Sequence, residues 1–228
     1  MTATYRIGHR RWLLILPTAI VVCAALVCAL AGGCGGGKSA RDVGLERYQT
    51  DFSAPDELQK NWKCHDSGKW EIRDGWLICD ERTPDTRSIL WLDKVLVEDV
   101  QIEFEAECLD KPSDLNCFVC GNGKNYSGYE IIVGGFNNTK LAVYKSGEDG
   151  EPTARNRLGR EDFELVKDRV YAIKIKKYRG QFRVYVDDEL ILTEVDDAPI
   201  RDIKYRYFGF STFQNVVRFD NLTIEKKD

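Results

Sequence analysis

The chain has 228 residues, with 33 Lys and Arg against 37 Asp and Glu, so its formal net charge at neutral pH is −4. The first 33 residues contain three of the basic side chains and no acidic one, which leaves 30 basic and 37 acidic residues and a charge of −7 for the rest. Nucleic-acid binders neutralise phosphates with a basic face, so this balance excludes nucleic acid from the expected partners. The stretch 44–228 is long enough for one substantial hydrophobic core.

The N-terminus has three successive parts. Arginines stand at positions 6, 10 and 11, an apolar run of 19 residues covers 12–30, and the small residues 31–33 precede Cys34. This is the layout of a secretory signal, so we expect residues 1–33 to be a signal peptide. The two arginines directly before the apolar run also resemble a twin-arginine export signal.

Cys34 lies directly after the small residues, which resembles the lipobox of bacterial lipoproteins and implies that this cysteine is lipidated. The Gly-rich stretch that follows predicts a flexible tether over 34–43. An uncleaved signal anchor stays open as the alternative, because a bilayer core needs about 20 apolar residues. In either case we expect an extracytoplasmic domain held at the membrane of a bacterial cell envelope.

Of the eight cysteines, five lie in the expected domain: Cys64, Cys79, Cys108, Cys117 and Cys120. Five is odd, so they cannot all pair within the chain. Buried thiols and one or two structural disulfides both stay open. The spacing of Cys117 and Cys120 puts them on opposite faces of a strand, which disfavours a metal or redox pair.

Period-2 alternation dominates the rest of the chain. Residues 100–108 put Ile102, Phe104 and Ala106 on one face and acids on the other, the pattern of a half-buried antiparallel strand. A three-strand meander is predicted over 170–176, 182–186 and 190–192. Further strands are predicted over 70–72, 76–79, 88–92, 115–120, 129–133, 141–144, 208–213 and 217–224, and helix only over 54–61 and 161–165.

Short strands separated by frequent turns predict an all-β fold, an antiparallel β-sandwich of the jelly-roll type over 44–228. Several motifs carry a resemblance: Asp51-Phe52, Trp62, 70–77, Leu90-Trp91, Gly209-Phe210 and 217–224. In this order they resemble the concanavalin A-like lectin/glucanase superfamily, and most closely the 3-keto-disaccharide hydrolase domain of exported bacterial lipoproteins.

The resemblance implies a carbohydrate ligand. Aromatic rings that stack on sugar faces and a few amide or carboxylate anchors are typical of sugar sites. The segment 116–144 concentrates both kinds, so the predicted ligand-binding residues are Trp91, Asn116, Asn122, Tyr126, Tyr129, Glu130, Asn137 and Tyr144. The alternative is that these asparagines are ordinary turn residues and these tyrosines ordinary sheet residues.

Catalysis is the second hypothesis. Glu103, Glu105 and Glu107 share one face of a strand about 7 Å apart, within the ~6.5 to 9.5 Å that inverting glycosidases use. Their spacing is similar to the alternating acid motif of the laminarinase and lichenase family, and His65 is a further acid/base candidate. The alternative is the solvent-facing side of a strand. The segments 113–118 and 129–132 lack the Asn-Ser-Gly and Glu-Val-Gln motifs usual in the hydrolase group. Carbohydrate binding is therefore the leading hypothesis, and the alternative is a glycoside hydrolase or a 3-keto-disaccharide hydrolase or lyase that acts on extracytoplasmic sugars.

No cofactor is expected except a structural calcium ion. Asp51 and Asp220 lie near the first and last predicted strands, and sandwiches of this superfamily often hold the two chain ends together with Ca²⁺, which prefers acidic oxygens.

Overall fold

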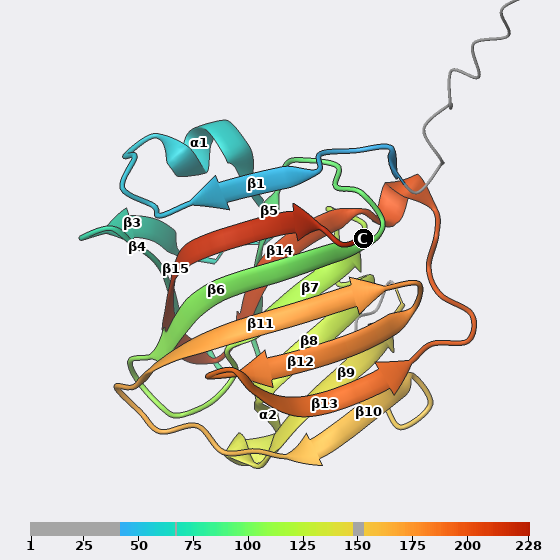
Figure 1. Cartoon of the computed structure of the whole chain (residues 1–228). Coiled ribbons are helices and arrows are strands. Elements are labelled where there is room, and N and C mark those ends of the chain that lie inside the picture. Colours follow the sequence, from blue (N-terminus) through green and yellow to red (C-terminus); the bar gives the residue numbers. More distant parts are fainter. Residues whose placement is uncertain (1–41, 67, 148–152) are drawn as a thin grey trace, which may run out of the picture. The chain divides into compact units, whose positions relative to one another are not determined.

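The computed structural model describes residues 42–66, 68–147 and 153–228 (Figure 1). The predicted signal peptide, Cys34 and most of the tether lie outside these residues. Within them, no helix is long and apolar enough to cross a membrane.

Two antiparallel sheets are stacked face to face (Figure 1). The eight-stranded sheet has the order β13 (Glu189–Val195), β12 (Gln181–Val186), β11 (Val170–Tyr178), β6 (Val100–Cys108), β15 (Asn215–Lys226), β4 (Trp76–Glu81) and β3 (Trp70–Arg73), with β1 (Arg47–Thr50) also paired to β15. The seven-stranded sheet has the order β10 (Arg157–Asp162), β9 (Lys140–Ser146), β8 (Gly128–Gly134), β7 (Asn116–Gly121), β14 (Tyr207–Phe213), β5 (Arg87–Leu92) and β2 (Trp62–Cys64). The predicted β-sandwich is therefore confirmed.

Helix is limited to the short elements α1 (Glu57–Asn61), α2 (Gly135–Asn138) and η2 (Ile203–Tyr205) among the residues described. The helix predicted over 54–61 exists as the shorter α1. The helix predicted over 161–165 is wrong, because Glu161 and Asp162 belong to β10 and pair with β9. The strands β1, β2 and β10 were not predicted, since they are short, polar or charged edge segments without clear alternation.

The predicted meander is confirmed by the β11–β12 and β12–β13 pairings. Its second turn has Asp187 and Asp188 at φ 51° and 64°, as a two-residue hairpin turn requires. The core lies between the sheets, where Phe104 and Phe219 of one sheet pack on Phe210 of the other with ring centroids 5.1 and 4.2 Å apart.

The five described cysteines are all free. Cys79, Cys108, Cys117 and Cys120 are buried, as in the buried-thiol alternative, and only Cys64 is exposed. Burial raises the pKa of the Cys108 thiol to about 12.

Candidate functional site

The outer face of the seven-stranded sheet is the surface that β5, β7, β8, β9 and β14 turn away from the core. Register places Phe118 beside Glu130, and Glu130 beside Tyr144, in one row across this face. This row holds aromatic rings next to a carboxylate, and all three side chains are buried beneath other groups of the same face. These are the two kinds of group that the sequence placed in a single segment.

One end of this face is covered. Trp91 is only 1% exposed, because its ring lies against the backbone of two glycines. A Cβ on Gly121 would come within 2.1 Å of the Trp91 ring, and one on Gly209 within 2.7 Å. Tyr126 and Tyr207 pack over the same cluster. The glycines therefore form the slot in which the indole lies.

The covering segment is the β7–β8 loop, residues 122–127. Asn122 Oδ1 accepts hydrogen bonds from the backbone N–H groups of Lys124 and Asn125, at 2.9 and 3.0 Å. The Tyr126 hydroxyl donates to Asp66 Oδ2 at 2.9 Å, and burial raises the pKa of Tyr126. The exposed His65 ring meets the Tyr126 ring edge-on at 5.5 Å. This loop is thus bound to both the sheet and the β2–β3 connection.

Next to the cover lies a buried ion pair. The Arg87 guanidinium donates to both carboxylate oxygens of Glu130, at 2.8 and 3.1 Å, and Glu130 is 1% exposed. The same guanidinium lies 5.3 Å from the centroid of the Tyr126 ring. Arg87 therefore marks the boundary between the covered part of the face and the open part.

Beyond Arg87 the face is hollowed. Two cavities of about 270 and 470 Å³ share the lining residues Asp114, Phe136 and Phe213, and together we call them the sheet-end hollow. The first is also lined by Asp85, Arg87, Asn116, Ile132 and Gly135, and the second by Lys111, Pro112, Ser113, Asn137, Asn138 and Gln214. Two phenylalanine rings, four side-chain amides and several charged groups thus border one concave site of the size usual for small ligands.

The loops around the hollow contain strained backbone. α2 is a left-handed turn in which Phe136, Asn137 and Asn138 have φ of 56°, 60° and 57°. The amide of Asn138 holds it in place, since its Nδ2 donates to Leu165 O at 2.9 Å and its Oδ1 accepts from Leu165 N at 2.8 Å. Asp114 is also left-handed, at φ 60°. Asparagine and aspartate tolerate this region, so the strained residue here is Phe136, which the surrounding structure holds in place.

The electrostatics of the hollow are mixed. Burial raises the pKa of Asp114, whose Oδ1 accepts a 3.3 Å hydrogen bond from Asn116. The Arg160 guanidinium lies 4.3 Å from the centroid of the Phe136 ring and covers one side of it. A ligand can therefore meet flat apolar rings and both donors and acceptors here.

The structure separates the predicted ligand-binding residues. The hollow is lined by Asn116 and Asn137. The covered end of the face contains Trp91, Asn122 and Tyr126. On the same face, Glu130 lies beside Arg87, and Tyr144 lies beside Phe136. Tyr129 is a correction: β8 alternation turns it into the core, where its ring packs 4.6 Å from Phe182.

Sequence reasoning missed Arg87, Asp114, Phe136 and Phe213. Phe136 follows two glycines inside the nominated segment, a signal that could have found it. Arg87 and Phe213 lie far from that segment in sequence and reach the hollow only through the β5–β14 register.

Glu103, Glu105 and Glu107 lie on the outer face of the other sheet. Glu107 is paired with Arg218, the amide of Asn221 donates to Glu105, and Lys174 lies 3.8 Å from Glu103. Glu103 and Glu105 are partly exposed, in agreement with the solvent-facing alternative, whereas Glu107 is buried beside Arg218.

Asp51 and Asp220 lie within electrostatic range of each other. Burial raises the pKa of Asp220, and the charges of Glu105 and Asp51 act in the same direction. Across residues 42–66, 68–147 and 153–228, no group of three or more His, Cys, Asp or Glu side chains is placed to hold a metal ion. A calcium ion at these two residues stays a prediction, which melting with and without a chelator tests.

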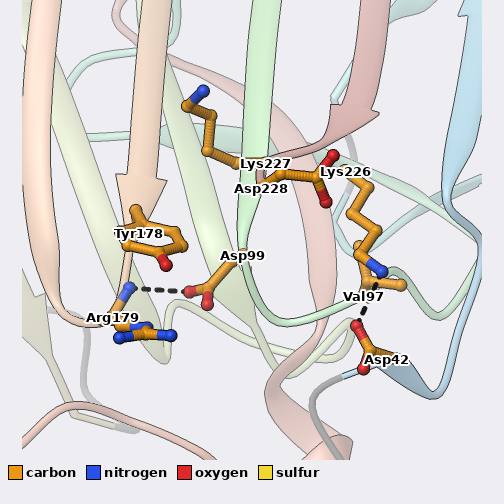
Figure 2. A pocket seen from close by; sticks show the side chains of 8 residues that line it. All are labelled: Asp42, Val97, Asp99, Tyr178, Arg179, Lys226, Lys227 and Asp228. Carbon is orange, nitrogen blue, oxygen red and sulfur yellow. Dashed lines mark hydrogen bonds and ion pairs between the residues drawn. The ribbon is translucent and has the colours of Figure 1, made fainter. Parts of the chain in front are cut away.

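A further pocket of about 290 Å³ lies beside the C-terminus (Figure 2). Two contacts join its charged groups to neighbours: Lys226 pairs with Asp42 at 2.8 Å, and Asp99 accepts from the backbone N–H of Arg179 at 2.8 Å. Tyr178 is its one aromatic residue. These contacts fasten the start of the described chain to its last strand, and the pocket lacks the paired aromatic rings of the sheet-end hollow.

No family model and no curated protein matches this chain. Solved structures share its fold. Carbohydrate binding module CBM66 from Bacillus subtilis has a TM-score of 0.59 at 16% identity, over 73% of this chain and 96% of that one. A Bacillus subtilis protein of unknown function with a galectin-like fold has a TM-score of 0.64 at 13% identity, over 78% and 94% of the two chains.

The exoplasmic/lumenal domain of VIP36, in its Ca²⁺/Man3GlcNAc-bound form, has a TM-score of 0.57 at 11% identity, over 80% of this chain and 89% of that one. At these identities the likeness shows the fold alone, a β-sandwich of the galectin-like kind. The fold implied by the sequence resemblance is confirmed at that level.

Proposed function

We propose that this protein is a carbohydrate-binding domain that holds a sugar in the sheet-end hollow. The observation that carries the proposal is the pair of rings, Phe136 and Phe213, that border one cavity together with Asp114 and Asn116. Pyranose C–H faces stack on aromatic rings, and hydroxyl groups exchange hydrogen bonds with carboxylates and amides. The names of the similar structures, a carbohydrate binding module and a sugar-bound lumenal domain, support the same function.

The proposal includes the location of the domain. The basic start, the apolar run and Cys34 favour export and a lipid anchor, with an uncleaved signal anchor as the alternative. The protein then recognises glycans outside the cytoplasm of a bacterial cell. Labelling with a radioactive fatty acid, and its loss in Cys34→Ser, would support lipidation; retained labelling would contradict it.

A glycan array followed by calorimetry tests the binding site. We expect Phe136→Ala and Phe213→Ala each to weaken binding about tenfold or more, equivalent to about 1.4 kcal/mol, because a stacking surface is lost. Tyr185→Ala is the matched control, since this aromatic residue lies on the eight-stranded sheet beside Lys176. Equal loss in the control, or full affinity in both phenylalanine variants, would refute the site.

The second candidate is a glycoside or 3-keto-disaccharide hydrolase. It is favoured by the half-buried Asp114, because a carboxyl whose pKa is raised by partial burial in a concave site suits a general acid. Product analysis on the glycans that bind separates the two functions: binding without products supports recognition, whereas products that disappear in Asp114→Asn support hydrolysis.

A further inference from the structure

We propose that the sheet-end hollow receives the end of a glycan chain and not an internal segment. This inference rests on the proposed function and deepens it. Its basis is the division of the outer face of the seven-stranded sheet into a covered part and an open part, with Arg87 between them.

The covered part cannot accept a ligand. Ile89, Trp91 and Phe118 point to the outer side of the sheet, yet none is more than 1% exposed. Tyr126 and Tyr207 are the partly buried residues that pack on them. A sugar chain that ran the full length of this face would have to displace both tyrosines.

The cover is fixed to the molecule at several points. Tyr126 donates to Asp66, which also accepts from the Ser88 hydroxyl at 3.0 Å and from the backbone N–H of Ile89 at 3.1 Å. Within the loop, Asn122 Nδ2 donates to Asn125 Oδ1 at 2.6 Å. Because these bonds connect the loop to β5 and to the β2–β3 connection, the cover is part of the folded domain and closes that side of the hollow.

Arg87 forms the end wall. Its guanidinium is held by Glu130 and by the face of Tyr126, and its side chain keeps 19% exposure while lining the smaller cavity. Held in this way between the cover and the hollow, the guanidinium closes the smaller cavity on that side.

The opposite side leads into the larger cavity, lined by Lys111, Pro112, Asn137 and Gln214. A glycan would therefore place its last residue in the smaller cavity, between Phe136 and Phe213, and leave through the larger one. The linings together contain two acidic side chains, Asp85 and Asp114, and two basic ones, Arg87 and Lys111, which favours a neutral sugar.

The test uses linear 1,4-linked gluco- and manno-oligosaccharides of two to six units, measured by calorimetry with the purified full chain. Each is also prepared with the non-reducing end blocked by a benzylidene acetal, and separately with the reducing end coupled to aminobenzamide. We expect affinity to stay within about threefold from the disaccharide to the hexamer, and one of the two blocked series to lose binding at least tenfold.

Stoichiometry gives a second measurement. With the matching polysaccharide we expect one protein per chain end, however long the polymer is. Binding that survives both blocking groups, affinity that rises steadily with length, or several proteins along one polymer would overturn chain-end recognition and leave carbohydrate binding intact. No binding to any unmodified glycan would instead remove the proposed function itself.

Discussion

Lys177 of β11 is fully buried and holds two acidic residues inside the sandwich. Its Nζ lies 2.9 Å from Glu98 O and 3.2 Å from Asp99 Oδ1. Arg206 approaches Glu98 Oε2 at 3.5 Å, so the four charges form one buried network. Lys177→Met keeps most of the aliphatic stem and removes the positive charge. We expect a loss of about 3–5 kcal/mol in unfolding free energy, because the buried Asp99 carboxylate then loses the cation beside it.

Urea and thermal unfolding measure this loss. In a domain of this size, each kcal/mol of lost stability lowers the Tm by about 2–4 °C, so the expected loss lowers the Tm by about 6–20 °C. Lys174→Met is the matched control, since Lys174 lies on the same strand but on the outer face, paired with the exposed Asp188. Such a surface pair contributes little, so the control should change stability by less than about 0.5 kcal/mol.

The double variant Lys177→Met/Asp99→Asn should recover part of the loss, because the carboxylate is removed together with its cation and the new amide oxygen at position 99 can still accept from Arg179 N. If Lys177→Met costs less than about 1 kcal/mol, or no more than Lys174→Met, then Arg206 alone compensates both acids and the reasoning is wrong.

Three further predictions concern single groups. Burial raises the folded-state pKa of Asp114, so ionisation of this carboxyl opposes folding, and the free energy of unfolding should fall as pH rises from the unfolded-state pKa through the folded-state pKa. Asp114→Asn should flatten that part of the curve of stability against pH. An unchanged slope in the variant would contradict the raised pKa. Gly121→Ala places a Cβ 2.1 Å from the Trp91 ring, so it should lower the unfolding free energy by about 1–3 kcal/mol and change the near-UV circular dichroism of the indole. Wild-type values for both measurements would show that the indole does not fill the space beside Gly121. Among the described cysteines, native alkylation followed by peptide mapping should modify Cys64 first, and earlier labelling of a buried thiol would refute the burial pattern.

Local pattern was enough to predict most of the strands. β6 reads as alternating apolar and acidic residues and folds that way, since one face must be buried and the other solvated. The turn at Asp187-Asp188 inside the predicted meander fits its residues too, because aspartate tolerates positive φ. Edge strands such as β10 were not predicted, because a strand with few core contacts needs no alternation of apolar and polar residues.

The candidate site was only partly readable. A Gly- and Asn-rich segment pointed to the face that carries the sheet-end hollow. Only the register decides which residues of a strand face outward, so Tyr129 is turned into the core while its neighbour Glu130 lies on the outer face. Composition cannot show that Trp91 is covered, because the cover is a loop that starts 31 residues later.

The sequence by itself determined the class of the protein: an acidic chain with a signal-like start and one β-sandwich, because period-2 burial and turn chemistry are local properties. Tertiary structure alone decided where a ligand can lie. Arg87, Asp114, Phe136 and Phe213 come from four separate segments, and pairing between distant strands is what brings them around one hollow. Long-range strand pairing follows from the burial of the whole core and not from any single segment.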